Sequence, residues 1–144
     1  VAVVVPSFEA LQDCPALSPE TRARAAAAFR RASSGPREER REDSDEAWAV
    51  CREPEVNAFI LDQLRGLCAQ NQLPHFQYPR AVLLDPVLWT TENNLVTPSF
   101  KLKRPFLRER FASQLAELLP KVRLEVAEAE KARSAAGASA SSAH

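Results

Sequence analysis

The residues best suited to chemistry lie in one basic segment, which reads SFKLKRPFLRER over residues 99–110. The segment contains a single acidic residue, Glu109. Its basic residues are Lys101, Lys103, Arg104, Arg108 and Arg110. Such a run is typical of a solvated basic face, of a nuclear-localisation or nucleic-acid patch, or of a site where a lysine meets an anionic phosphate. Composition alone leaves these three interpretations open.

The rest of the composition narrows the classes of function. The chain has 19 basic and 19 acidic residues among 144, so its overall charge favours neither nucleic acid nor membrane. Cys14, Cys51 and Cys68 are an odd number without Cys-x-x-Cys spacing, which indicates buried or incidental thiols in a reducing compartment. His75 and His144 have no neighbours at ligand spacing, so we expect no metal site.

The beginning of the chain suggests a piece of a longer protein. The sequence contains no Met, and VAVVVP, a pattern typical of a buried strand, starts at the first residue. We therefore expect a fragment or a processed product. No signal-peptide pattern is present, and no apolar run approaches the roughly 18 residues that cross a bilayer.

The elements that would hold the basic segment alternate between strands and helices. VAVVVP predicts a strand that stops at Pro6, and RAVLLDP predicts a second short buried strand that ends at Asp85 and Pro86. Between them, EPEVNAFILDQLRGLCAQN predicts a helix with Pro54 in its first turn. Its apolar stripe, which we expect to face the core, consists of Val56, Phe59, Ile60, Leu64, Leu67 and Cys68.

The basic segment itself follows a turn and leads into another helix. VLWTTENNLVTPSFKLKRP predicts two short extended pieces around the turn residues Asn93 and Asn94. PFLRERFASQLAELL, from Pro105, predicts an amphipathic helix whose apolar face consists of Leu107, Phe111, Leu115, Leu118 and Leu119. The sequence thus predicts a small α+β domain, in which helices flank a short mixed sheet.

Two regions of low complexity interrupt this pattern. The composition of residues 12–45 predicts an insertion that is helical or disordered. We expect it to lie on the surface and to have no catalytic or binding role. Its first half opens with Ser18 as N-cap and Pro19 at N1, but its apolar residues are nearly all small and can bury little area. Its second half, SSGPREERREDSDE, is typical of a solvated loop. The small residues of segment 128–144 predict a disordered tail, so the domain would occupy residues 1–127.

One segment carries a resemblance to a known family. TPSFKLKRP resembles the lysine motif of the AMP-forming adenylating enzymes, in which a Thr-Pro pair precedes the lysine. ENNLVTPSFKLKRP is closer to the long-chain acyl-CoA synthetases than to the acetate-type or luciferase branches, which usually have Ser-Gly where this chain has Ser99-Phe100. VAVVVP, CREPEVNAFILDQL and RAVLLDP follow in the family's order. The resemblance covers Val1–Leu11 and roughly Trp48–Leu119.

The resemblance implies a fold, a reaction and a site. The chain would be the C-terminal lid domain of a long-chain fatty-acid–CoA ligase, in which ATP and a fatty acid form acyl-adenylate and pyrophosphate before coenzyme A displaces AMP. Lys101 matches the lysine that reaches the α-phosphate and the attacking carboxylate. Lys103 and Arg104 would support the phosphates or simply face solvent, whereas Thr97 and Pro98 would shape the turn.

The chain departs from the family's pattern at two places. The family usually has Asn-Gly before the motif, and this chain has Asn93-Asn94. Because asparagine is the next-best residue for a positive φ, we expect the turn to survive. Glu53 stands where an aspartate often caps the helix, and glutamate is a weaker N-cap.

The resemblance also implies partners. The family's phosphate loop, its adenine and acyl pockets and its hinge would precede Val1, so ATP, Mg²⁺ and coenzyme A would be bound mainly by a separate N-terminal adenylation domain. The isolated chain would then lack ligase activity. The location implied is intracellular, at the cytosolic face, with the full-length protein peripheral on the endoplasmic reticulum or another organelle membrane. The alternative is a non-catalytic binding module derived from such a lid.

Overall fold

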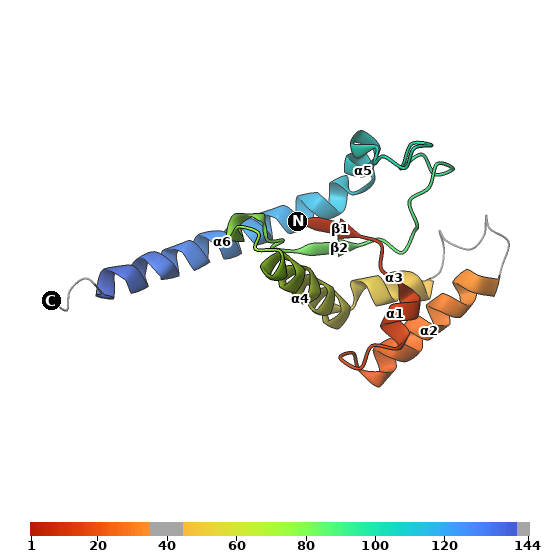
Figure 1. Cartoon of the computed structure of the whole chain (residues 1–144), viewed down its shortest axis with the longest axis horizontal. Coiled ribbons are helices and arrows are strands. Elements are labelled where there is room, and N and C mark those ends of the chain that lie inside the picture. The colour runs from red at the N-terminus through yellow and green to blue at the C-terminus, as the bar shows by residue number, and fades with distance from the viewer. Residues whose placement is uncertain (35–44, 141–144) are drawn as a thin grey trace. The chain divides into compact units, whose positions relative to one another are not determined.

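The computed structural model describes residues 1–34 and 45–140, and Figure 1 shows their helices and strands. The chain forms two compact units, Val1–Lys103 and Arg104–His144. The described residues are mostly helical and include a small two-stranded parallel sheet. This composition of elements is consistent with the predicted α+β class.

Both predicted strands are confirmed, and they pair with each other. Strand β1 (Ala2–Val4) and strand β2 (Val82–Leu84) lie side by side in parallel, with Val3 opposite Leu83 (Figure 1). A parallel pair needs a long crossover, and the helices α1 to α4 form it. The sheet is therefore parallel and not mixed as predicted, because the antiparallel pairing found among the described residues is an isolated bridge outside it, between Val96 and Leu102.

Helix α4 (Pro54–Gln70) confirms the predicted amphipathic helix, although its stripe is buried over only part of its length. Val56 is fully buried, and Phe59, Ile60 and Leu64 pack against the core. Leu67 is 53% exposed, so its assignment to the core was wrong. The reason is length, because a 17-residue helix spans about 25 Å whereas the three-residue strands that it packs against span about 10 Å.

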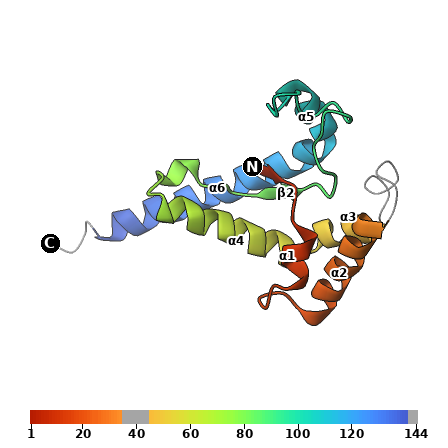
Figure 2. The same ribbon diagram turned by 45° about the vertical axis from the view of Figure 1, so that its right-hand side comes forward.

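The helical half of the predicted insertion belongs to the core. Helices α1 (Phe8–Gln12), α2 (Pro19–Ser34) and α3 (Asp45–Arg52) lie together beside the first turns of α4, as Figures 1 and 2 both show. Leu17 and Ala25 are buried in the same cluster as the strand residues. Residues 12–34 are therefore not the surface excursion that we predicted. Small alanines let the α2 backbone approach its neighbours closely, and residues 35–44 lie outside the described part of the chain.

A partly buried polar connection joins α2 to α4. Ser18 caps α2 as predicted, since its Oγ accepts the backbone N–H of Thr21 at 3.3 Å. The carboxylate of Glu55, in the first turn of α4, accepts the Ser18 N–H at 2.7 Å, the Ser18 hydroxyl at 3.0 Å and the Thr21 hydroxyl at 2.8 Å. These bonds, led by the one from Thr21, lower the pKa of Glu55.

A second, charged connection lies next to it. The guanidinium of Arg24 pairs with Glu53 and, at 2.7 Å, with Glu20 one turn earlier in α2. Glu53 is the N-cap residue of α4, but its side chain makes no capping hydrogen bond, as expected for glutamate at this position. Its carboxylate instead ties α4 to α2.

The second unit contains two helices where the sequence predicted one. Helix α5 (Arg104–Arg110) ends before Phe111, which is buried as predicted, and α6 (Ala112–Ala140) follows. The backbone bond from Leu115 N–H to the Phe111 carbonyl, at 2.9 Å, continues the helical pattern across the break. Leu119 is 38% exposed, which contradicts its predicted place in the core.

The predicted disordered tail is helical over most of its length. Helix α6 continues to Ala140, so residues 128–140 do not form the disordered segment that we expected, and residues 141–144 lie outside the described part. The segment is rich in alanine, glutamate, lysine and arginine, which have high helix propensity. Within the described residues, no helix is both long and apolar enough to cross a membrane.

The Glu55 cluster predicts a specific dependence of stability on pH. Because folding lowers the Glu55 pKa from its ordinary value of 4.5, its stabilising contribution is present above pH 4.5 and is lost as the pH falls through the folded value. We expect the stability gap between the native chain and Glu55→Gln to narrow as the pH falls below 4.5. Urea unfolding at a series of pH values measures it. A constant gap contradicts the prediction, and Glu92→Gln, at an exposed loop position, is the control.

Candidate functional site

A short hairpin presents the candidate lysine. The bridge between Val96 and Leu102 flanks a turn in which the Thr97 N–H donates to the Lys101 carbonyl at 2.9 Å. The Phe100 N–H donates to the Thr97 carbonyl at 2.8 Å, and Pro98 follows Thr97 at the second position of the turn. This is a three-residue hairpin loop closed by a left-handed residue. The chain does turn at Asn93-Asn94 as predicted, but the antiparallel pairing lies across this second turn and not across the first.

The side chain of Thr97 fixes the geometry of this turn. Its Oγ1 accepts the backbone N–H of Lys101 at 3.0 Å and lies 3.0 Å from the hydroxyl of Ser99. The Pro98 ring restricts φ at the point where the chain begins to reverse. Thr97 and Pro98 therefore determine where the backbone of Lys101 lies.

Lys101 is the first residue after the turn, and its side chain is exposed. Among the described residues, neither an ion pair nor a side-chain hydrogen bond engages its ammonium group. The ammonium is a compact charge on a flexible stem, so it is accessible to an anion that approaches the end of the hairpin.

Lys103 is placed differently, although it is only two residues further along the same strand. It is half-buried, its ammonium donates to the side-chain oxygen of Asn94, and its N–H donates to the Leu95 carbonyl at 2.9 Å. Asn94 has φ 60°, which confirms that asparagine can replace the family's glycine in this turn. Lys103 thus anchors the hairpin to the preceding turn.

A buried carboxylate holds the segment that leads from β2 toward the hairpin. Asp85 is fully buried, and its two oxygens accept the Val87 N–H at 3.1 Å and the Trp89 indole N–H at 3.0 Å. Burial, and secondly the charge of Asp85, raise the pKa of Cys51 to about 12, so this thiol stays protonated and unreactive. From the sequence we saw Asp85 only as the end of a strand. The signal for its role was a tryptophan four residues later.

Phe100 has an unusual conformation for its residue type. Its φ is 58°, in the left-handed region that a bulky side chain rarely adopts, and its ring is 83% exposed. The related branches usually have glycine directly before the lysine, and glycine takes a positive φ without steric cost. The glycine of the related branches was therefore the sequence signal for a positive φ at this position.

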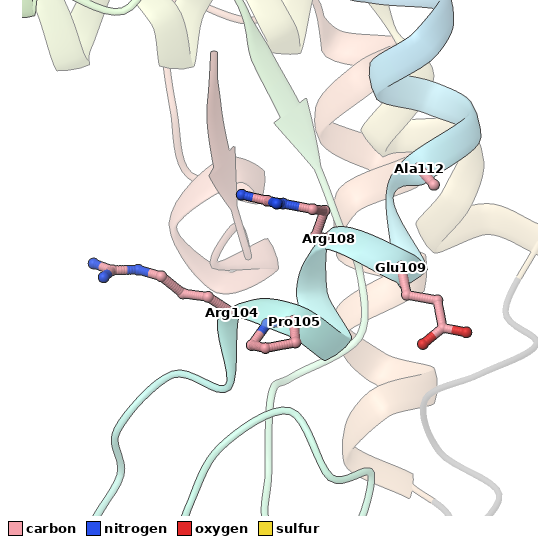
Figure 3. A pocket seen from close by; sticks show the side chains of 5 residues that line it. All are labelled: Arg104, Pro105, Arg108, Glu109 and Ala112. Carbon is pink, nitrogen blue, oxygen red and sulfur yellow. The ribbon is translucent and has the colours of Figure 1, made fainter.

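Arg104 belongs to the second unit, where it begins α5. An open concavity of about 430 Å³ is lined by Arg104, Pro105, Arg108, Glu109 and Ala112. Figure 3 shows these five side chains. Both guanidinium groups extend to the same side, and the Glu109 carboxylate points the other way (Figure 3). From the sequence, Arg108 was only one member of the charge run, because its alignment with Arg104 depends on where α5 begins and ends.

The chain is similar to known CoA ligases and long-chain acyl-CoA synthetases over about half of its length. It is 35% identical over 75 residues to a probable CoA ligase of Humulus lupulus, covering 52% of this chain and 11% of that protein. It is 34% identical over 73 residues to the peroxisomal long chain acyl-CoA synthetase 7 of Arabidopsis thaliana, covering 51% and 10%. The resemblance to long-chain acyl-CoA synthetases is confirmed.

The same similarity extends to animals. The human long-chain-fatty-acid–CoA ligase 1 is 33% identical over 75 residues, which are 52% of this chain and 11% of that protein. The chain therefore spans about a tenth of the length of the curated relatives that it matches. No protein-family model matches the chain, and no solved structure matches it.

The conformation of Phe100 predicts that glycine stabilises the hairpin. Phe100→Ala removes the ring but keeps the Cβ that opposes a positive φ, whereas Phe100→Gly removes both. We expect the glycine variant to be more stable than the alanine variant by about 0.5 to 1 kcal/mol, the left-handed penalty less the added chain entropy. Urea unfolding of the two variants measures the difference. Equal stability, or a less stable glycine variant, contradicts the prediction.

Proposed function

We propose that the chain is the C-terminal lid part of a long-chain fatty-acid–CoA ligase and that Lys101 supplies the cation for adenylation. In this proposal residues 1–127 are the partial lid domain, now with the packed helix α2 included. The observation that supports it best is the exposed ammonium of Lys101 at the end of the hairpin, which no ion pair or side-chain hydrogen bond engages among the described residues. The relatives' names support the ligase chemistry.

The chemistry favours a lysine at this place. In the first half-reaction a fatty-acid carboxylate attacks the α-phosphate of ATP, so two anions must approach each other and negative charge builds on the oxygens bound to phosphorus. An ammonium between them offsets this charge. A flexible lysine stem lets the group follow the reacting atoms while Thr97 keeps its backbone fixed.

Other cations have supporting parts in this proposal. Lys103 keeps its charge while its ammonium is held by Asn94, so it contributes a positive potential without leaving its place. Arg104, the first residue of α5, is proposed as a further phosphate contact. The described residues bring together no three histidine, cysteine, aspartate or glutamate side chains suited to a metal ion. In this proposal the Mg²⁺ of the reaction is bound by the nucleotide and the adenylation domain, as the family resemblance implies.

The proposal requires a partner, which is an adenylation domain that binds ATP, the fatty acid and coenzyme A. The chain spans about a tenth of its relatives, and such a domain would supply the phosphate loop and acyl pocket in the remainder. We place the whole protein at the cytosolic face of an organelle membrane; one relative's name marks it as peroxisomal. A non-catalytic module that docks through the same hairpin is the alternative that the experiments below exclude or support.

Substitution of the lysine separates the two half-reactions. In the enzyme reassembled from this chain and an adenylation domain, we expect Lys101→Ala to slow acyl-adenylate formation about a hundredfold, because a charge contact in the transition state is lost. Conversion of supplied acyl-adenylate to acyl-CoA should be spared. Rapid-quench measurement of each step tests this. Lys121→Ala, at an exposed position of α6, is the control, and equal loss of both steps rejects the role of Lys101.

The chain by itself should be inactive. The proposed acyl and adenine pockets belong to the adenylation domain, so mixing the isolated chain with fatty acid, ATP, Mg²⁺ and coenzyme A should give no pyrophosphate above the level of a Lys101→Ala sample. A coupled pyrophosphate assay provides the measurement. Release above that control would show that the chain is itself a catalyst and would overturn the division of labour proposed here.

A further inference from the structure

Helix α2 ends with two arginines followed by serines. Its last five residues, 30–34, read RRASS. The resemblance to acyl-CoA synthetases does not include residues 12–45, so the proposed lid chemistry gives these side chains no role. A kinase whose substrate groove is acidic selects a serine that follows two arginines by two and three residues, because each guanidinium can form a bidentate pair with a carboxylate. At that spacing the acceptor is Ser33.

An ion pair ties the last turn of α2 to the first turn of α3. The guanidinium of Arg31 lies 2.7 Å from the carboxylate of Glu46, and the arginine side chain is 64% exposed. Asp45 precedes Glu46, so α3 begins with two acidic residues. Further along the same pair of helices, Ala25 of α2 and Val50 of α3 are fully buried in the core. The ion pair therefore stands at the exposed edge of a helix contact whose interior is buried.

We propose that Ser33 is a phosphorylation site and that its phosphate weakens the contact between α2 and α3. In the transfer the serine oxygen bonds to the γ-phosphorus of ATP, while the bond from that phosphorus to the β–γ bridging oxygen breaks. ADP leaves, and the hydroxyl proton passes to a base of the kinase.

Two electrostatic effects of this phosphate act in the same direction. It adds about two negative charges at the carbonyl end of α2, where the helix dipole disfavours negative charge. The added charge also repels the carboxylates in the first turn of α3, which the Arg31–Glu46 pair holds beside the end of α2. Both effects oppose the packing of α2 against α3.

Labelling of the chain tests the acceptor. The probe is the catalytic subunit of cyclic-AMP-dependent protein kinase with ATP and Mg²⁺, and mass spectrometry of the digested chain locates the phosphate. We expect phosphate on Ser33, its loss in Ser33→Ala, and undiminished labelling of Ser33 in Ser34→Ala, the matched control one residue away. Arg30→Gln with Arg31→Gln should slow labelling about tenfold or more, because two charge-assisted contacts to the kinase are lost. No labelling of Ser33, or labelling that does not depend on the arginines, overturns the proposal.

Unfolding in urea measures the effect on the helices. Phosphorylation should raise the unfolding equilibrium constant about threefold, through repulsion at the helix end and from the carboxylates. Ser33→Ala treated with the same kinase is the control and should not change. Asp45→Asn with Glu46→Gln should reduce the difference, because the repelling charges are gone. Unchanged or raised stability on phosphorylation, or a difference that survives this double substitution in full, overturns the proposal. Lys101 is intact throughout, so either result is independent of the adenylation role proposed above.

Discussion

The candidate site depends on one constraint, which is that the backbone reverses direction within three residues immediately before Lys101. The reversal needs a residue with positive φ, and in this chain Phe100 takes that conformation at 58°. The steric cost is offset by hydrogen bonds from both sides of the turn, in which the Thr97 side chain accepts the Lys101 N–H and the Thr97 N–H donates to the Lys101 carbonyl. Local strain of this kind persists only where neighbouring contacts enforce it.

Those neighbouring contacts reach back to the core through polar groups. The fully buried Asp85 carboxylate binds the Val87 N–H and the Trp89 indole, and so fixes the segment that leaves β2. Asn93 continues this support, because its amide donates to the Leu88 carbonyl and its oxygen accepts the Thr90 N–H. Each bond is modest by itself, but unpaired buried groups would be costly, which makes the arrangement specific.

The sequence predicted the elements better than their surroundings. Strands β1 and β2, helix α4 and the Ser18 cap followed from local patterns of apolar residues and helix-start residues. The burial of α2 did not follow, because alanines bury little area each and the gain comes from close packing of three helices. The turn at Phe100 could not be predicted either. Its positive φ is imposed by hydrogen bonds on both sides of the turn and opposes the conformational preference of phenylalanine.

The contrast between Lys101 and Lys103 shows how a short basic run acquires distinct functions. Only Lys103 lies within reach of the Asn94 side chain, whose neutral oxygen restrains the ammonium but leaves its charge intact. A carboxylate in that position would have cancelled the positive potential that an anion meets. The neutral partner therefore gives the hairpin a fixed positive charge at its base, while the ammonium at its end remains accessible. Two lysines of equal charge thus differ because a single amide is within reach of one of them.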